Sequence, residues 1–370
     1  MNNINVDLMS QGQGTGEVAR FLQANGRIDP NAMRPYVDPK TGKSWVSVYK
    51  GTGDPKDMAN YIAVNAYTGT LRPDEWKMLD EAVVGVSRER LTGFDYLMSK
   101  GLTFNLPNAM GTTVLEWHSA SDSQEAILSM DAVTRGQGDR SIFKQHFLPI
   151  PIIHADYEIN SRVLAVARNA GNGIDTAEAE HAARRIMEMK EDMLFTDTTY
   201  AFGDKGTNGR NSIYSLVNYP DRNLVDLTLP WTDSAMSAAL ILADVVSCKN
   251  ASIAAKHYGP WTLFIPTAYD PILDEDYSVS GSSLMTIRER ILKIAGINDI
   301  VVVDTLAADN VLMVQTTPNV VRIINGLPLQ NIEWTTEGGM VHKYKVMTIQ
   351  VPQIRSDYDG NNGITHLAAI

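Results

Sequence analysis

The chain has 370 residues, of which 44% are hydrophobic and 20% are charged, a composition that excludes a disordered or fibrous protein. Its net charge of -11 disfavours a dedicated DNA-binding protein, because the average surface repels phosphate groups at long range. The length is sufficient for a sizeable core, which we expect to be divided among two or three lobes.

The first 70 residues are rich in glycine and proline, and little of this segment is able to bury itself. Isolated aromatic residues such as Tyr36, Trp45 and Tyr61 are typical of a segment that lies along another surface. We therefore predict an N-terminal arm over residues 1–71 whose order depends on its neighbours.

A helix is predicted after this arm, because Pro73 is followed by two acidic residues and by an apolar stripe that ends at Leu91. Short β-like pieces, among them residues 125–133, then alternate with glycines between residues 102 and 147 and predict a long β excursion. Residues 148–157 are strongly apolar with two prolines near the start, which favours an edge or bulged strand over a central one.

The strongest helical pattern begins at Asp175, which stands three residues before Glu178 as in a capping pair. One face of this helix is predicted to be apolar, and its residues are Ala179, Ala182, Ala183, Ile186, Met189, Met193 and Leu194. A glycine-rich loop then precedes residues 213–217. Later segments are helices at 233–249 and 284–295, and strands at 261–266, 300–304, 311–315, 320–324 and 340–351. This order is α+β without regular βαβ alternation, and no internal repeat is present.

No pattern in the sequence indicates catalysis. The glycines of residues 11–16 are not preceded by a strand and match no nucleotide-binding spacing, which favours a flexible arm over a phosphate loop. The seven histidines are scattered, without the i, i+4 spacing that pairs metal ligands on a helix. No Gly-x-Ser-x-Gly, His-Glu-x-x-His or Walker sequence occurs. We therefore expect no enzyme, no cofactor, no metal site and no catalytic residue.

Charged residues alternate in sign on the helix that follows Asp175, which is typical of a solvated or subunit-facing surface. They are Glu178, Glu180, Arg184, Arg185, Glu188, Lys190, Glu191 and Asp192. The only cysteine, Cys248, lies in an apolar setting, which favours a buried structural thiol over a nucleophile. A single cysteine excludes an intrachain disulfide, and neither a signal peptide nor a membrane span is recognisable, so we expect assembly in the cytoplasm.

The order of these segments, over roughly residues 72–355, resembles the Hong Kong 97 shell fold of tailed-phage capsid proteins and encapsulins. The segments that carry the resemblance are Leu71-Arg72-Pro73-Asp74-Glu75-Trp76, Phe147-Leu148-Pro149-Ile150-Pro151, Phe202-Gly203 with Gly206 to Ser215, Gly259-Pro260-Trp261-Thr262-Leu263-Phe264-Ile265 and Ile300-Val301-Val302-Val303. Their order, more than any one of them, is typical of the family.

The resemblance implies an N-terminal arm, an extended β loop, a spine helix, a discontinuous peripheral domain and an axial domain. The corresponding ranges are 1–71 for the arm, 72–100 for the first peripheral part, 101–147 for the extended loop, 148–232 for the second peripheral part with the spine helix at 175–199, 233–334 for the axial domain, and 335–370 for the third peripheral part and C-terminus. A long two-stranded excursion is marginal alone, and a repeating shell supplies the partner surface that it needs.

The function that the resemblance implies is that of a major capsid protein, which self-assembles through pentamers and hexamers into an icosahedral shell around phage double-stranded DNA. The alternative is an encapsulin shell around a cargo enzyme, but its body would begin near Leu71, and the long polar arm favours the phage shell. An unrelated cytoplasmic α+β enzyme is a third interpretation.

The expected partners are many copies of the chain itself, a portal, possible scaffolding or decoration proteins, and DNA held without sequence-specific contact. No membrane is expected among them. The expected location is the virion, with assembly in the cytoplasm of the host bacterium.

In the phage that names the fold, a lysine of the extended loop joins covalently to an asparagine of a neighbouring subunit. Residues 101–143 of this chain contain no lysine, and their only basic residues are Arg135 and Arg140. Guanidinium groups are not expected to act as nucleophiles. We therefore predict a non-covalent interface through these arginines and through apolar contacts near Ile142 and Phe143.

A second interface is predicted at the axial tip, in the polar segment from Tyr277 to Ser283 between a strand and a helix. Its candidate residues are Tyr277, Ser280 and Gly281. Because a monomer could not cover the apolar surface of the loop and arm, we expect closed particles or capsomer rings.

Overall fold

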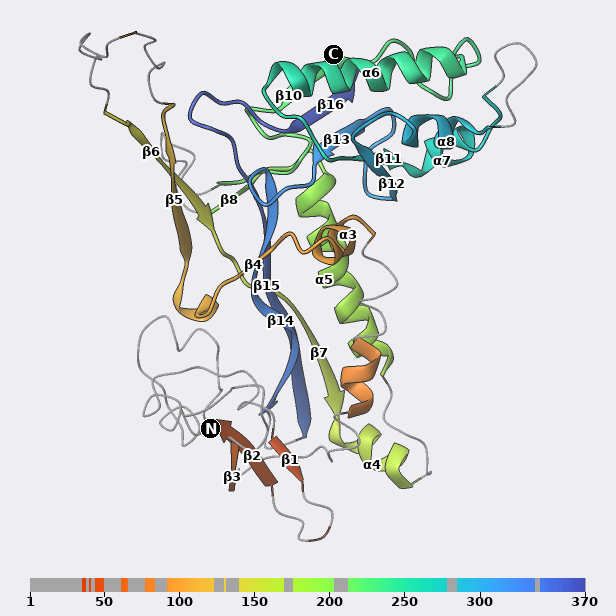
Figure 1. Cartoon of the computed structure of the whole chain (residues 1–370). Coiled ribbons are helices and arrows are strands. Elements are labelled where there is room, and N and C mark those ends of the chain that lie inside the picture. Colours follow the sequence, from red (N-terminus) through yellow and green to blue (C-terminus); the bar gives the residue numbers. More distant parts are fainter. Residues whose placement is uncertain are drawn as a thin grey trace. The chain divides into compact units, whose positions relative to one another are not determined.

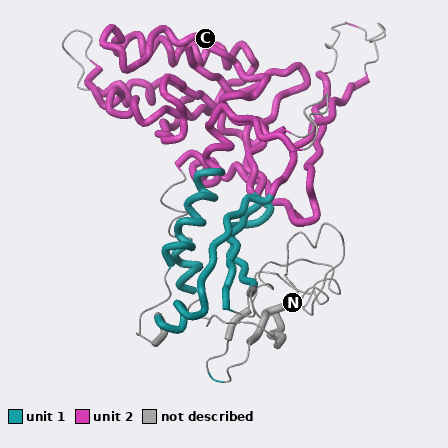
Figure 2. Tube along the Cα trace, turned by 180° about the vertical axis from the view of Figure 1, so that it is seen from behind, with its two compact units in different colours: residues 1–90, 152–189, 326–349 teal, residues 91–151, 190–325, 350–370 magenta. Residues whose placement is uncertain are grey.

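The computed structural model of the chain describes residues 35–37, 40, 44–49, 61–65, 77–83, 92–122, 130, 140–169, 176–202, 212–277, 285–336 and 340–369. They belong to two compact units (Figure 2). Unit 1 comprises residues 1–90, 152–189 and 326–349, and unit 2 comprises residues 91–151, 190–325 and 350–370. Three long elements continue from one unit into the other, so the units are not separate sequence domains.

The three elements shared by both units are one helix and two strands. They are α5 (Ala177–Phe195), β14 (Val321–Thr336) and β15 (Val341–Ile354). The strands belong to a sheet of order β4-β14-β15-β7, in which β4 (Thr103–Asn105) and β7 (Ile153–Asn160) are the edges. In unit 1, β7 pairs antiparallel with β15 (Figure 1).

The core of unit 1 lies between this sheet and the helices. The small side chains of Ala179 and Ala183 let α5 pack closely, and Tyr344 on β15 stacks on Tyr157 at 4.9 Å between ring centroids. The other members are Leu79 and Val83 in the helical residues 77–83, Leu164 on α4 (Ser161–Asn169), Ala182, Ile186 and Val346. Burial of each large apolar side chain stabilises the fold by roughly 1.5–3 kcal/mol.

Unit 2 contains a mixed five-stranded sheet of order β10-β16-β13-β11-β12. The strands are β10 (Asn223–Asp226), β11 (Trp261–Pro266), β12 (Ile297–Val303), β13 (Val311–Gln315) and β16 (Ile364–Ala368). All six residues of β11 are buried, as expected for an apolar run with strands on both sides.

Three helices pack against this sheet and contribute to the core of unit 2. They are α6 (Ala238–Ala254), α7 (Asp270–Leu273) after the short turn η5 (Thr267–Tyr269), and α8 (Ile287–Leu292). Ser237 caps α6 by accepting a hydrogen bond from the N–H of Leu240. Trp231 stacks on Tyr269 at 4.9 Å between ring centroids inside the same core.

Smaller elements complete the described fold. They are β1 (Pro35–Val37), β2 (Ser44–Tyr49) and β3 (Tyr61–Asn65) in one antiparallel sheet, α3 (Gly93–Ser99), η4 (Ala109–Gly111), the antiparallel pair β5 (Val114–Ala120) and β6 (Phe143–Pro149), and the pair β8 (Tyr200–Ala201) and β9 (Ser212–Ile213). The predicted strand at 125–133 lies outside the described residues except for residue 130.

Several sequence predictions are confirmed with shifted ends. The predicted edge strand is β7, and the two prolines fall at and just after the end of β6. The helix predicted from Asp233 begins later because Ser237 provides its cap.

Two predictions about the face of α5 are wrong. Met189 is 40% exposed, and Met187 is buried in its place. Lys190 and Glu191, which we expected on a solvated or subunit-facing surface, are 3% and 4% exposed in the single chain. Both have partners far away in the sequence, and helical periodicity does not reveal such partners. The predicted capping residue Asp175 lies outside the described residues.

Candidate assembly interface

Of the seven predicted interface residues, four are described by the structure. Arg140 is exposed just before β6, and Ile142 and Phe143 at the start of this strand are 61% and 65% exposed. Tyr277 is partly buried against the core of unit 2. The other three, Arg135, Ser280 and Gly281, lie outside the described residues.

The β5–β6 hairpin carries the predicted loop interface. Its two strands have only each other as partners in the described sheet, and such pairs are marginally stable alone. Trp117 stacks on His146 at 5.3 Å between ring centroids, and the hydroxyl of Ser119 is 2.9 Å from Nε2 of the same histidine. These contacts hold the middle of the hairpin, while its apolar end at Ile142 and Phe143 stays open to a partner.

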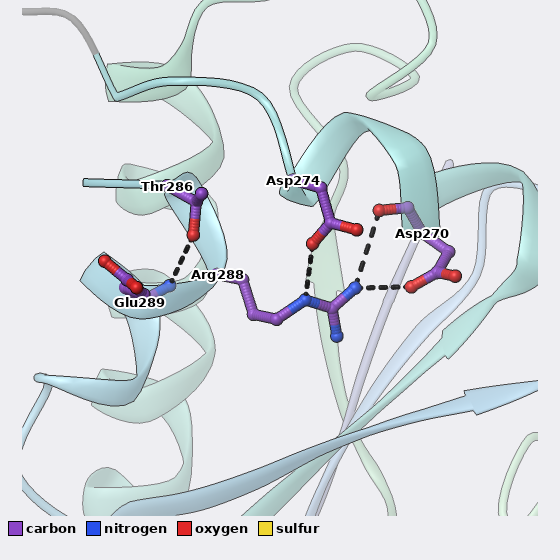
Figure 3. Close-up of polar contacts among 5 residues, drawn as sticks. All are labelled: Asp270, Asp274, Thr286, Arg288 and Glu289. Atoms are coloured by element: carbon purple, nitrogen blue, oxygen red, sulfur yellow. Dashed lines mark hydrogen bonds and ion pairs between the residues drawn. The ribbon is translucent and has the colours of Figure 1, made fainter. Parts of the chain in front are cut away.

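The predicted axial tip is held together at its base. The N–H of Tyr277 donates to the carbonyl of Met285 at 2.7 Å. The guanidinium of Arg288 donates to the carboxylates of Asp274, at 2.8 Å, and of Asp270 (Figure 3). Thr286 caps α8 by accepting from the N–H of Glu289. These contacts fix the position at which the chain enters and leaves residues 278–284.

A buried polar cluster, which the sequence analysis missed, joins α5 to α3 within unit 2. The Glu191 carboxylate accepts hydrogen bonds from the N–H groups of Gly93 at 3.0 Å and Phe94 at 3.2 Å. It thereby satisfies backbone donors at the start of α3. Burial raises the pKa of Glu191, and these N–H donors oppose that shift.

Lys190 lies beside this carboxylate. Its ammonium group donates to Oε1 of Gln350 at 2.8 Å and sits 4.8 Å from the ring centroid of Phe94. Gln350 in turn donates to Asn325 at 3.0 Å. Burial lowers the pKa of Lys190 to about 8, although the nearby carboxylates of Asp95 and Glu191 favour its charged form.

The other end of α3 is fixed to the five-stranded sheet. The Tyr96 hydroxyl donates to Asp299 at 2.5 Å, and Lys100 forms an ion pair with the same carboxylate at 2.7 Å. Lys100 and Tyr96 lower the pKa of Asp299 through these hydrogen bonds. Thus polar contacts at its two ends attach α3 to α5 and to β12. We therefore assign α3 a structural role in unit 2.

Three side chains in unit 1 are arranged in the serine–histidine–carboxylate order of a hydrolase catalytic triad. The Ser161 hydroxyl is 2.6 Å from Nε2 of His342, whose Nδ1 is 3.2 Å from the Glu333 carboxylate. The N–H of Ser161, however, donates to the carbonyl of Met340, and the N–H of the next residue donates to the side chain of Asn160. These two groups are therefore occupied and give no oxyanion hole beside the serine.

Other chemical features can be stated for the described residues. Cys248 is buried as predicted, and burial raises its pKa to about 12, so the thiol stays protonated. Within the described part of the chain, no group of three or more metal-ligating side chains could hold a metal ion. In the same part, no helix is long and apolar enough to cross a membrane.

Solved structures with a similar fold are shells. The virus-like particle of Pyrococcus furiosus is 16% identical, with a TM-score of 0.57 over 79% of this chain and 98% of that chain. The capsid of Myoviridae phage XM1 is 10% identical, with a TM-score of 0.56 over 76% and 94%. The capsid of a native GTA particle is 12% identical, with a TM-score of 0.51 over 87% and 97%.

These likenesses show that the chain has the Hong Kong 97 shell fold, which confirms the predicted fold class. Residues 65–367 match a family described as a family of unknown function, DUF6260, and the chain belongs to this family. No curated protein matches the sequence.

Proposed function

We propose that the chain is a major capsid protein, which self-assembles through pentamers and hexamers into an icosahedral shell that encloses phage double-stranded DNA. The observation that carries this proposal is the fold, which covers at least 94% of three shell-forming chains. The exposed apolar end of the hairpin, at Ile142 and Phe143, supports it, because a single copy leaves this surface open.

The proposed subunit contacts are non-covalent. Arg135, Arg140, Ile142 and Phe143 are assigned to the loop that reaches a neighbouring copy. The second set is assigned to contacts around a symmetry axis, and it consists of Tyr277, Ser280 and Gly281. Heterologous contacts of this kind close into rings when the rotation between copies permits it.

The proposed partners are many copies of the chain, a portal, and possible scaffolding or decoration proteins. DNA is enclosed without sequence-specific contact, since a chain with a net charge of -11 does not grip phosphates broadly. The proposed location is the virion, after assembly in the cytoplasm of a host bacterium.

A second candidate function is an encapsulin-like compartment around a cargo enzyme. The likeness to the virus-like particle of Pyrococcus furiosus, which extends over 98% of that chain, favours it. A purified particle distinguishes the two candidates, because a phage shell contains DNA or is empty, whereas a compartment contains a second protein.

Electron microscopy of the expressed protein tests the proposal. We expect closed particles or capsomer rings of uniform diameter, with the absorbance ratio and a gel reporting nucleic acid or cargo. A stable monomer at high protein concentration, over a range of salt and pH, contradicts both candidate functions.

A further inference from the structure

Three polar side chains of unit 2 lie on one face of the sheet that contains β14 and β15. Arg322 is the second residue of β14, and its Nε donates to Oε1 of Gln353 on β15 at 2.5 Å. The N–H of Arg355 donates to the carbonyl of Val320 at 2.9 Å, so the same register continues beyond the end of β15. Because alternate residues of a strand share a face, Arg355 lies on the face of Gln353. The two arginines are therefore diagonal neighbours across the strands.

The guanidinium of Arg322 is held in place by its surroundings. It lies 4.4 Å from the ring centroid of Phe104 on β4, the strand that pairs with β14 on its other side. This contact and the hydrogen bond to Gln353 fix its orientation. Since Gln353 uses only Nε, the two Nη atoms have no acceptor among the described residues. Their edge is able to donate two parallel hydrogen bonds to an oxyanion.

The two arginines and Gln353 lack the negative charge and the acceptor that would satisfy them. Among the described residues, no carboxylate lies within 4.0 Å of either guanidinium. The side chain of Gln353 is fully buried, and its Nε2 has no hydrogen-bond partner in the same part of the chain. An unmet buried donor costs roughly 1–3 kcal/mol. Burial lowers the pKa of Arg322, and the positive charge of Arg355 lowers it further.

One carboxylate is fixed to the residue that follows Arg355. The Oδ2 of Asp221 accepts from the hydroxyl of Ser356 at 2.8 Å, and this hydroxyl is also 3.1 Å from that of Tyr219. Asp221 is therefore used to join these segments and forms no ion pair with Arg355. Even if its charge is counted, two positive charges stand against one negative charge.

A phosphate group with free oxygens fits this arrangement better than a carboxylate does. One guanidinium saturates both oxygens of a carboxylate, which carries a single charge. A phosphate monoester or free phosphate carries close to two charges at neutral pH and has three or more acceptor oxygens, so it offers acceptors to both arginines. Because Arg322 is already held, binding does not have to order this long side chain.

We propose that Arg322, Arg355 and Gln353 form a binding site for one phosphate group, supplied by free phosphate or by the terminal phosphate of a nucleotide. Extended contact with a nucleic-acid backbone needs many cations along a surface, whereas only two are gathered here. The inference goes beyond the proposed shell function and does not depend on it, because the three side chains belong to a single chain.

Isothermal titration calorimetry of the full-length chain with sodium phosphate, at constant ionic strength, tests this site. Arg355→Gln removes one cation, and Arg322→Lys keeps the charge but loses the planar fork of donors. The control Arg185→Gln removes an arginine whose side chain is 80% exposed and pairs with Glu188 at 3.1 Å. Circular dichroism checks that the variants are folded, and Arg355→Gln alone is sufficient if Arg322→Lys is not.

We expect the wild type to bind phosphate with a Kd of about 1 mM or below, and each site variant to bind roughly tenfold or more weakly. The control should bind like the wild type. Adenosine monophosphate that binds as tightly as phosphate indicates a nucleotide as the source, and phosphate that binds alone indicates the free ion.

Four results would overturn the inference. The first is the absence of binding by the wild type at about 20 mM phosphate. The second is an equal loss of affinity in the control, which would indicate a general effect of charge. The third is acetate that binds as tightly as phosphate. The fourth is an oligonucleotide without a terminal phosphate that binds equally well, which would indicate a contact with the nucleic-acid backbone instead. All four leave the shell function intact.

Discussion

Burial of the charged Lys190 side chain lowers the stability of the folded chain at neutral pH. The folded state lowers its pKa from the ordinary 10.5 to about 8, mainly through burial. Between these values the unfolded chain binds more protons than the folded chain. The free energy of unfolding should therefore rise as the pH increases from about 8 to 10.5, and the charge lowers stability below pH 8.

The variant Lys190→Met tests this effect in the unassembled protein. Denaturant unfolding at several pH values from about 7 to 10 should show the largest advantage of the variant at neutral pH, because an apolar side chain of similar volume replaces a buried charge. That advantage should shrink by roughly 1–3 kcal/mol as the wild-type lysine loses its proton. A difference that is independent of pH contradicts the shifted pKa of Lys190.

At the scale of elements, the contact between α3 and α5 depends on a residue without a side chain. A Cβ atom on Gly93 would lie 2.2 Å from Cε2 of Phe195, far below a normal contact distance. Because the N–H of Gly93 also binds Glu191, α3 cannot move away without losing that hydrogen bond. Glycine is therefore required here for close approach.

We expect Gly93→Ala to lower the free energy of unfolding by about 2–3 kcal/mol, the cost of overpacking a dense contact. Gly101→Ala is the control, since a Cβ atom added there would meet no atom within 4 Å and only the positive φ of 74° opposes it. That substitution should cost about 1 kcal/mol. Denaturant titration measures both, and equal effects would show that the contact with Phe195 adapts freely.

At the scale of the whole molecule, a shell of these subunits must be stable through many repeated weak contacts. The loop residues 101–143 contain no lysine that could form an amide bond to a neighbouring copy. Each charge-assisted contact contributes at most a few kcal/mol. Repetition over the lattice then provides the stability of the particle.

Particles boiled in denaturing detergent should therefore release a single band at or below the monomer mass of 40.7 kDa. Gel electrophoresis of purified particles is sufficient for this measurement. A ladder of covalent multimers would show that the non-covalent interpretation is wrong, and mass spectrometry of the ladder would identify the residues joined.

The order of the elements could be predicted from the sequence because it depends on local patterns. The apolar run 261–266 directly indicates the buried strand β11, and the spacing of Ala179, Ala183 and Ile186 identifies the core face of α5. Cys248 was recognised as buried for the same reason. The Hong Kong 97 fold was expected from the resemblance of the segment order to known shell proteins, and the similar solved structures confirm it.

Only the tertiary structure decided which polar residues are buried. Lys190 reaches Gln350, and Glu191 reaches the N–H of Gly93, across 160 and 98 positions of sequence. Helical and strand periodicity describe the face on which a residue lies, whereas the burial of a charge depends on a distant partner that satisfies it. That partner is fixed by the packing of the chain, and therefore no local pattern of the sequence reveals it.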